Sequence, residues 1–311
     1  MKRIICMLLT LCLILGGCSA GTDTQGEAVF TFTDDLGREV RLMSEPKRVA
    51  CLLGSFADVW TLAGGTVIAA PDDAWEDFGL AMEGATVLGS AKSLSLELLL
   101  AAEPDFILAS ANTRQQLGWL DTLEATGIPT AYFNVSGFRD YLGMLKICTD
   151  ITGRADLYEQ NGTAVQAGFD GAVSYARQKI SESGQAPTVL CLRLAASGIR
   201  VKNSRDNVLG ELLASLGCVN IADSDTVLLE NLSMEHILLA DPDCIFLVQQ
   251  GDDDAGAQAA LDTFIGENPG WQTLTAVREG RVHTLDKRRY SLKPNALWAE
   301  ACRDLAELIW P

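Results

Sequence analysis

The sequence predicts an α/β fold of two lobes, each with a mainly parallel sheet flanked by helices, joined by one long rigid helix. One helix–loop–strand unit occurs twice, as SLSLELLLAAEPDFILAS at residues 93–110 and as NLSMEHILLADPDCIFLV at residues 231–248. In both halves, short apolar runs alternate with helical stretches, which is typical of parallel sheets covered by helices. Between the halves, residues 154–180 carry apolar side chains near helical spacing. At 1.5 Å per residue such a helix is long enough to run beside both lobes.

The two copies of the unit share eight of eighteen positions and lie 138 residues apart. Ser95 and Ser233 are good N-caps, and Glu97 and Glu235 follow in the first turn, where a carboxylate suits the helix dipole. A proline then ends each helix. Two similarly built lobes are the working hypothesis. The alternative is that helix-ending and loop signals, which are common in α/β proteins, recur here by chance.

The remaining elements follow from the same patterns. Residues 29–42 alternate apolar and polar side chains around DDLG, which predicts an antiparallel hairpin. The apolar runs predict strands at 48–53, 66–70, 105–110 and 130–133, and then at 188–194, 218–222, 243–248 and 281–285. The predicted domains are an N-terminal lobe at 29–138, a linking helical segment at 139–183 and a C-terminal lobe at 184–311. A peripheral helix of one domain is the alternative to the linking helix.

The first residues predict export. Two cations precede an apolar stretch from Ile4 to Leu15, which is too short to span a bilayer of about 30 Å. The sequence LGGC that ends at Cys18 looks like a bacterial lipobox, so residues 1–17 are expected to be removed and Cys18 to carry the lipid anchor. Residues 18–28 then form a tether. A plain secretory signal is the alternative.

Charge and cysteine usage narrow the class of protein. The formal net charge of −17 argues against nucleic acid as a partner and leaves membrane attachment to the lipid. Six cysteines follow Cys18 without any C-x-x-C pair, and three of them lie inside apolar runs. We expect core thiols rather than disulfides. The six are Cys51, Cys148, Cys191, Cys218, Cys244 and Cys302.

Several segments together resemble one family. These are TDDLGREVRL, EPKRVACLLGSFADVWTLAGG, the doubled unit, TDITGRADLYEQNG and the ending KPNALWAEACRDLAELIWP. In order and spacing they are similar to substrate-binding lipoproteins of ABC importers for ferric siderophores, haem and cobalamin, over essentially the whole mature chain. The resemblance implies a monomeric, extracytoplasmic binding protein rather than an enzyme, lipid-anchored to the bacterial cytoplasmic membrane. It would have no cofactor of its own and would deliver a metal chelate to an ABC permease dimer with its ATPase subunits.

The resemblance also implies a role for the two glutamates of the doubled unit. In that family one surface glutamate on each lobe docks onto arginines of the permease, and the matching positions here are Glu97 and Glu235. Carboxylate–arginine contacts can be bidentate and supply orientation more than affinity. Either glutamate could instead serve only the helix dipole.

Loops facing a cleft between the lobes supply the candidate ligand contacts. Trp75 and Tyr290 could stack on a macrocycle or a catecholate, and a cationic side chain could neutralise an anionic chelate. A surface or packing role is the alternative for each. The candidates are Ser55, Trp75, Lys92 and Asn112 in the first lobe, and Arg193, Arg289 and Tyr290 in the second.

Other chemistry finds little support in the sequence. The chain has only two histidines, His236 and His283, so a three-histidine zinc site cannot be built and no resident metal is expected. The stretch GDDDAG at 251–256 lacks the alternating ligands and terminal glutamate of a calcium loop. Haem could be held by Tyr290 or by a methionine such as Met43 or Met82, although no position compels it.

Two alternatives of other classes stay open. One is a lipid-anchored enzyme or metallocluster-handling protein on the same scaffold, for which Asp72, Asp73 and Asp286 are acids without an obvious partner. The other is a surface sensor or adhesin, which would not need the two glutamates.

Overall fold

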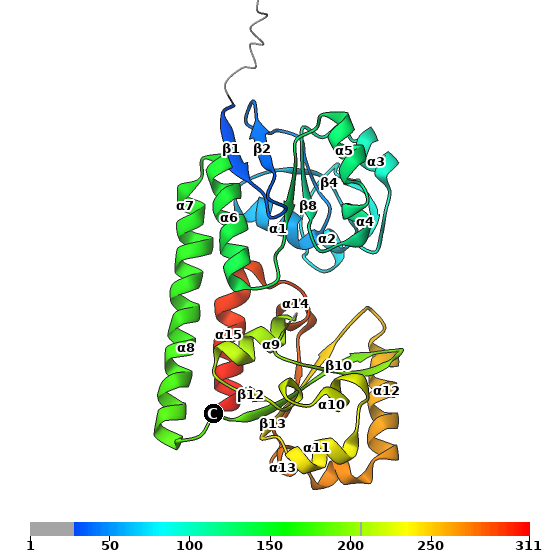
Figure 1. The fold of residues 1–311 in the computed structure, drawn as a ribbon, viewed down its shortest axis with the longest axis vertical. Coiled ribbons are helices and arrows are strands. Elements are labelled where there is room, and N and C mark those ends of the chain that lie inside the picture. The colour runs from blue at the N-terminus through cyan, green and yellow to red at the C-terminus, as the bar shows by residue number, and fades with distance from the viewer. Residues whose placement is uncertain (1–27, 206) are drawn as a thin grey trace, which may run out of the picture.

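The computed structural model describes residues 28–205 and 207–311. Two α/β lobes lie end to end, and long helices line one side of both (Figure 1). The fold class predicted from the sequence is confirmed. The predicted signal peptide and Cys18 lie outside the described residues. Within the described ranges, no helix combines the length and apolarity needed to cross a membrane.

The N-terminal lobe begins with the predicted antiparallel hairpin, β1 (Phe30–Thr33) with β2 (Glu39–Leu42). Its main sheet is entirely parallel, in the order β5 (Thr86–Val87), β4 (Val67–Ala70), β3 (Val49–Cys51), β8 (Phe106–Ser110) and β9 (Thr130–Phe133). A small ribbon joins β6 (Gly89–Ser90) to β7 (Ser93–Leu94). The helices are α1 (Gly54–Leu62), α2 (Asp73–Glu76), α3 (Leu96–Ala101), α4 (Arg114–Leu117) and α5 (Leu120–Thr126).

The C-terminal lobe has the sheet order β11 (Gly198–Lys202), β10 (Thr188–Ala195), β13 (Cys244–Gln249) and β14 (Val282–Leu285), with β12 (Val219–Asn220) also paired to β10. The sequence did not predict β11, which runs antiparallel to β10. The helices of this lobe are α9 (Val208–Ser215), α10 (Thr226–Glu230), α11 (Met234–Ala240), α12 (Asp254–Glu267), α13 (Thr275–Arg278), α14 (Lys287–Tyr290) and α15 (Trp298–Ile309). The 3₁₀ turns are η2 (Ile221–Asp223), η3 (Pro269–Thr273) and η4 (Asn295–Leu297).

Both sheets are buried on two faces, which explains their continuous apolar runs. In β3, Val49 and Cys51 join one core cluster, whereas Ala50 joins the other. In β13, Phe246 faces the first of these clusters and Leu247 a third one. The cluster that faces the long helices is common to both lobes.

The linking segment is more complex than the single rod predicted from the sequence. It starts with α6 (Phe138–Thr152), which ends at Gly153 in the left-handed conformation. A continuous helical run follows through α7 (Ala155–Tyr158), the π-turn η1 (Glu159–Thr163) and α8 (Ala164–Ser183). We call residues 155–183 the strut.

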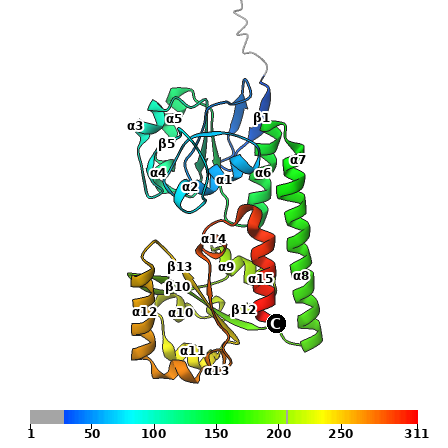
Figure 2. The same cartoon turned by 180° about the vertical axis from the view of Figure 1, so that it is seen from behind.

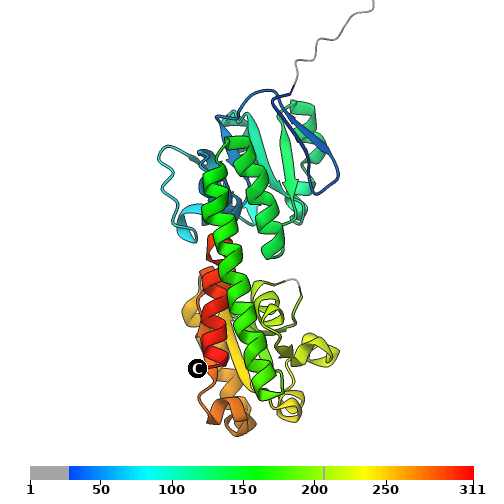
Figure 3. The same cartoon turned by 90° about the vertical axis from the view of Figure 1, so that its left-hand side faces the viewer.

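The strut packs along α15 beside the C-terminal lobe and beside α6 at the N-terminal lobe (Figure 3). Its π-turn lies where it contacts the N-terminal lobe. There Asn161 donates to the carbonyl of Leu62 at 2.9 Å, and its own carbonyl accepts from the hydroxyl of Tyr141 at 2.7 Å. The π-turn therefore carries a buried anchor to the N-terminal lobe.

Aromatic rings join the strut to both lobes. Phe138, at the start of α6, stacks on Phe169 of the strut at 4.4 Å between ring centroids and lies 5.8 Å from Trp298 of α15. Because these three elements share one packed core, we expect only modest relative motion of the lobes.

The doubled unit is confirmed by matching side-chain caps and backbone angles in the two lobes. Ser95 and Ser233 each accept the N–H three residues further on, at 3.2 Å and 3.4 Å. Before each proline, Glu103 and Asp241 adopt positive φ values of 48° and 40°. The two helices thus start and stop in the same way.

The aspartate that closes each unit also has the same role in both lobes. Asp105 accepts the backbone N–H of Arg48, next to the start of β3, at 2.9 Å. Asp243 accepts the backbone N–H of Thr188, the first residue of β10, at 2.8 Å. A chance recurrence of helix caps and prolines would not reproduce these long-range hydrogen bonds. The two lobes are therefore built alike.

The six cysteines after Cys18 are free and buried. Burial raises the pKa of these thiols, for example of Cys51 well above its ordinary value. Thiols held in this way are unreactive core side chains. The prediction of core thiols is confirmed.

Candidate functional site

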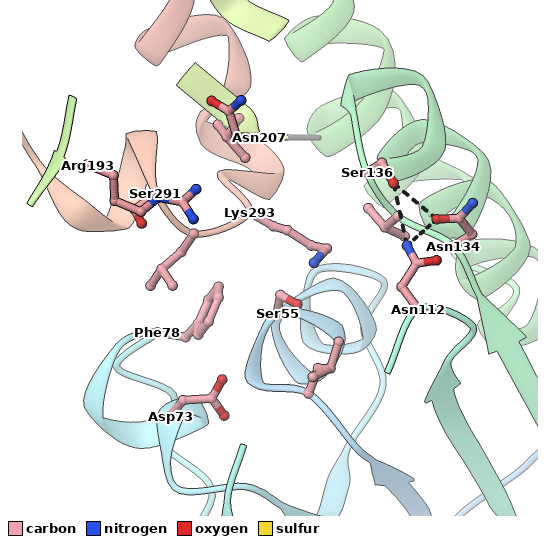
Figure 4. A pocket seen from close by; sticks show the side chains of 14 residues that line it. Ser55, Asp73, Phe78, Asn112, Asn134, Ser136, Arg193, Asn207, Ser291 and Lys293 are labelled. Atoms are coloured by element: carbon pink, nitrogen blue, oxygen red, sulfur yellow. Dashed lines mark hydrogen bonds between the residues drawn. The ribbon is translucent and has the colours of Figure 1, made fainter. Parts of the chain in front are cut away.

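A cavity of about 680 Å³ lies between the lobes and is lined by both (Figure 4). Side chains reach it from just beyond the carboxyl ends of parallel strands, where open α/β sheets place ligands. Ser55 follows β3, Asp73 follows β4, and Asn112 follows β8. The lining residues are Leu53, Ser55, Asp73, Phe78, Asn112, Asn134, Val135, Ser136, Arg193, Asn207, Val208, Ser291, Leu292 and Lys293.

The wall on the N-terminal lobe is polar. Asn112 donates from its side-chain amide to the amide oxygen of Asn134, and the Ser136 hydroxyl donates to the same oxygen at 3.0 Å. This network connects the loop after β8 to the loop after β9 (Figure 4). It presents hydrogen-bonding groups in fixed positions to a hydrophilic guest.

Asp73 is the acidic group among the described residues that line this cavity. Its Oδ1 accepts the backbone N–H of Gly54 at 3.1 Å. A side chain at Gly54 would lie 2.7 Å from the same oxygen, so the close approach requires glycine there. Burial raises the pKa of Asp73 to about 6; the Gly54 bond opposes this shift, and the charge of Asp77 adds to it. The carboxyl can therefore change its protonation state near neutral pH.

Two cations face the same cavity without a carboxylate partner. Among the described residues, Arg193 and Lys293 form no ion pair, and Nε of Arg193 is buried without a hydrogen bond. Burial lowers the pKa of both groups, and for Lys293 the nearby charge of Asp73 partly offsets this effect. In Figure 4 the amino group of Lys293 points toward Ser55. Because desolvated cations are costly without a counter-charge, this arrangement suits an anionic guest.

A second compartment of about 310 Å³ adjoins the first and shares Asp73 and Arg193 with it. Lys287 closes part of this compartment. Its Nζ donates to Asp77 of the N-terminal lobe at 2.8 Å and to Asp252 of the C-terminal lobe at 2.6 Å.

Four of the seven candidate ligand contacts lie at these cavities. Ser55, Asn112 and Arg193 line the larger one, whereas Lys92 and Arg193 line the smaller one. Their placement agrees with the loops predicted to face the cleft.

The structure places the other three elsewhere. Trp75 packs against the core of the N-terminal lobe and lines neither cavity. Tyr290 is only 5% exposed, and its hydroxyl donates to the carbonyl of Ala301 at 3.3 Å. Arg289 pairs with Asp304 on α15. Trp75 lies on α2, and α14 turns Arg289 and Tyr290 toward α15 and the core, so none of the three lines either cavity.

Sequence reasoning missed Asn134, Ser136 and Lys293. Asn134 follows β9 as Asn112 follows β8, so the strand-end pattern could have identified it. Lys293 had no such signal, because the segment that carries it crosses from one lobe to the other after the last strand.

The candidate haem ligands also lie away from the cavity. Met43 is 52% exposed on the hairpin side, and Met82 packs against the core. Among the described residues, no histidine, methionine, tyrosine or cysteine lines the larger cavity. His236 instead lies 2.6 Å from Asp225, and His283 stacks on a phenylalanine. No group of three or more potential ligands in the described ranges is arranged to hold a metal ion.

Glu97 and Glu235 are both exposed, and neither has a hydrogen bond or ion pair within the described residues. Their helices, α3 and α11, belong to different lobes, and both lie away from the strut (Figures 1 and 2). The two carboxylates are thus free to meet an external partner.

Comparison with known proteins identifies the family. The model of the periplasmic binding protein family matches residues 49–289. The chain belongs to this family. Among its relatives, the Bacillus subtilis protein YhfQ, named as a candidate ABC transporter substrate-binding lipoprotein, is 25% identical over 97% of this chain and 95% of its own. YfmC of the same organism, named as an Fe(3+)-citrate-binding protein, is 25% identical over 91% of this chain and 89% of its own.

Solved structures share the fold of this periplasmic binding protein. Staphylococcus aureus SirA, complexed with staphyloferrin B, has a TM-score of 0.68 at 19% identity, covering 89% of this chain and 96% of SirA. The resemblance drawn from the sequence is therefore confirmed. It favours the importer interpretation over the enzyme and sensor alternatives.

Proposed function

We propose that this protein captures a hydrophilic, anionic metal chelate between its lobes, outside the cytoplasmic membrane, and delivers it to an ABC importer. The observation that carries the proposal is the pair of unpartnered cations, Arg193 and Lys293, in one interlobe cavity. In a chain with a net charge of −17, acidic groups are abundant, yet neither cation has one as an ion-pair partner among the described residues. A bound anion would supply the missing counter-charge.

The character of the wall supports a ferric hydroxycarboxylate as the ligand. Six of the described lining residues carry an amide or a hydroxyl, and Phe78 is the single aromatic side chain among them. Haem needs an axial ligand and apolar side chains against its two faces, and a catecholate needs aromatic side chains on which to stack. This lining does not provide these groups. The name of YfmC, an Fe(3+)-citrate-binding protein, supports the same class.

Delivery would use two further features. Cys18 would carry the lipid that keeps the protein at the membrane, where tethering raises its concentration at the permease. Glu97 and Glu235 would each contact one subunit of the permease dimer, so that a monomer of the binding protein sits across both. The chelate itself would be the cargo, and capture and delivery would need no resident cofactor.

Tryptophan-fluorescence titration of the purified mature protein tests the proposal. The probes are ferric citrate, haemin and cyanocobalamin. We expect ferric citrate to bind most tightly, and Arg193→Met and Lys293→Met each to weaken binding about tenfold to hundredfold, as for loss of a charge-assisted hydrogen bond. The control Lys47→Met removes an exposed cation outside the cavities and should leave affinity unchanged. Tighter binding of haemin, or equal affinities of all variants for ferric citrate, would overturn the proposal.

A further inference from the structure

The segment at residues 286–295, which we call the strap, leaves the C-terminal lobe after β14 and contacts the N-terminal lobe before α15 begins. Lys287 reaches Asp77 of the N-terminal lobe at 2.8 Å. At the other end, the side-chain amide of Asn295 donates to the Ser55 carbonyl at 2.9 Å and to Asp58 Oδ2 at 2.8 Å. The strap is therefore held on α1 and α2 although its sequence belongs to the second lobe.

Arg288 stands at the centre of this contact. Its Nη2 donates to Asp58 Oδ2 at 3.0 Å, and its guanidinium lies 4.2 Å from the centre of the Phe78 ring. Its Nη1 donates to the backbone carbonyls of Lys293 at 2.8 Å and of Pro294 at 3.3 Å. One side chain thus joins the N-terminal lobe to the backbone that carries Lys293. A planar guanidinium can make these contacts together, whereas an ammonium cannot.

The backbone next to this contact supports a fixed geometry. Asn295 is fully buried and has a φ of +55°, a conformation that non-glycine residues seldom adopt. Such a conformation persists only where the surrounding contacts determine it. The bonds from Asn295 and Arg288 to the same carboxylate of Asp58 provide those contacts.

We infer that Arg288 is a positioning residue for ligand capture: it fixes the strap to the N-terminal lobe, so that Lys293 faces the cavity as a cation of that lobe. Arg193, on β10, belongs to the C-terminal lobe. The two cations that meet the ligand therefore move with different lobes. An anion bound between them pulls the lobes together. This inference rests on the proposed function for its effect on ligand binding, but the placement of Lys293 can be measured without any ligand.

Arg289 provides a matched control. It is the next residue on the same short helix, is of the same type, and has a side-chain exposure of 33% against 22% for Arg288. Its partners are Asp304 and Glu300 on α15 and Asp286 at the start of the strap, none of them in the N-terminal lobe. Losing Arg289 removes ion pairs of similar kind without touching the strap's contacts to the N-terminal lobe.

The first experiment measures affinity for ferric citrate in Arg288→Gln, Lys293→Met, the double variant and Arg289→Gln. We expect Arg288→Gln to weaken binding about tenfold and Arg289→Gln to change it less than about twofold. In the Lys293→Met background, Arg288→Gln should add less than about twofold, because residues that act through one another are not additive. A merely structural role would give multiplying effects in this cycle and would overturn the inference. Arg288→Lys keeps the positive charge but not the planar set of guanidinium donors, so its affinity for ferric citrate should resemble that of Arg288→Gln.

The second experiment needs no ligand and separates this inference from the proposed function. Acetylation of Lys293 by acetic anhydride is followed by peptide mass spectrometry in the folded protein. We expect slow modification in the wild type and in Arg289→Gln, and modification at least about threefold faster in Arg288→Gln, because the strap is released. Equal rates in all three proteins would refute the role of Arg288. If the rates differ as expected while ferric citrate binds none of the proteins, the proposed function fails and the positioning of Lys293 stands.

Discussion

Asp73 makes the affinity for an anionic chelate depend on pH. Its carboxyl shares the cavity with Arg193 and Lys293, and burial raises its pKa to about 6. Below this pH the carboxyl is neutral and does not repel an anion. Above it the carboxylate is charged, opposes the anion and partly compensates the cations. Affinity should therefore fall as the pH rises through about 6, and Asp73→Asn should remove this part of the pH dependence.

The magnitude follows from Coulomb's law. Two unit charges about 8 Å apart interact by about 2 kcal/mol at an effective dielectric of about 20, which corresponds to about thirtyfold in affinity. This is an upper value, because the cavity is open and water screens part of the interaction. We expect wild-type affinity to fall about threefold to tenfold more between pH 5 and pH 7.5 than that of Asp73→Asn. Asparagine keeps an oxygen that can accept the bond from Gly54, so the loop is expected to retain its shape.

The assay is a fluorescence titration with ferric citrate at a series of pH values. Comparing wild type with Asp73→Asn at each pH cancels any change in the iron complex itself. Asp121→Asn, on exposed α5, controls for the loss of one negative charge far from the cavities. If the ratio of wild-type to Asp73→Asn affinity stays constant from pH 5 to pH 7.5, the carboxyl does not act on the ligand and the reasoning is refuted.

Three further changes test other parts of the molecule. Changing Glu97 and Glu235 together to Ala should abolish uptake of the chelate by cells while affinity stays within about threefold; normal uptake would contradict docking. Cys18→Ala should move the protein from the membrane fraction to the soluble fraction, and retention would mean another anchor. Phe138→Ala empties a buried site between α6, the strut and α15 and should cost about 3–5 kcal/mol of unfolding free energy. Urea denaturation measures this, and a loss below about 1 kcal/mol would show that the aromatic junction does not hold the lobes.

The sequence predicted those parts of the fold that repeat a local rule. The doubled unit, the hairpin and nearly every parallel strand followed from periodicity, caps and prolines, because these patterns act over a few residues. Strand β11 escaped prediction because IRVK at 199–202 is short and lies after a turn. The π-turn escaped because a buried bond from its own Asn161 to the carbonyl of Leu62, a residue far away in the sequence, determines it.

The candidate site was predictable to the extent that it follows strand ends. Ser55, Asn112 and Arg193 sit on or after the strands of a parallel sheet, and topology alone brings such positions to one edge. The residues around α14 do not obey this rule. Arg288, Arg289 and Tyr290 are consecutive, yet one faces the N-terminal lobe and the next two face α15 or the core. The direction in which each of these side chains faces depends on the path of the strap between the lobes.

That path bears on how the protein works as a carrier. The strut, the aromatic junction at Phe138 and the strap connect the lobes at separate places, so the cavity is largely formed before a ligand arrives. A preformed site loses little free energy to ordering when it binds, and its selectivity then depends on where Arg193 and Lys293 are held. A carrier this stiff opens little by itself, so it must be opened at the permease to release its cargo. Two docking carboxylates on separate lobes, Glu97 and Glu235, would let the two permease subunits pull the lobes apart, which one docking site could not do.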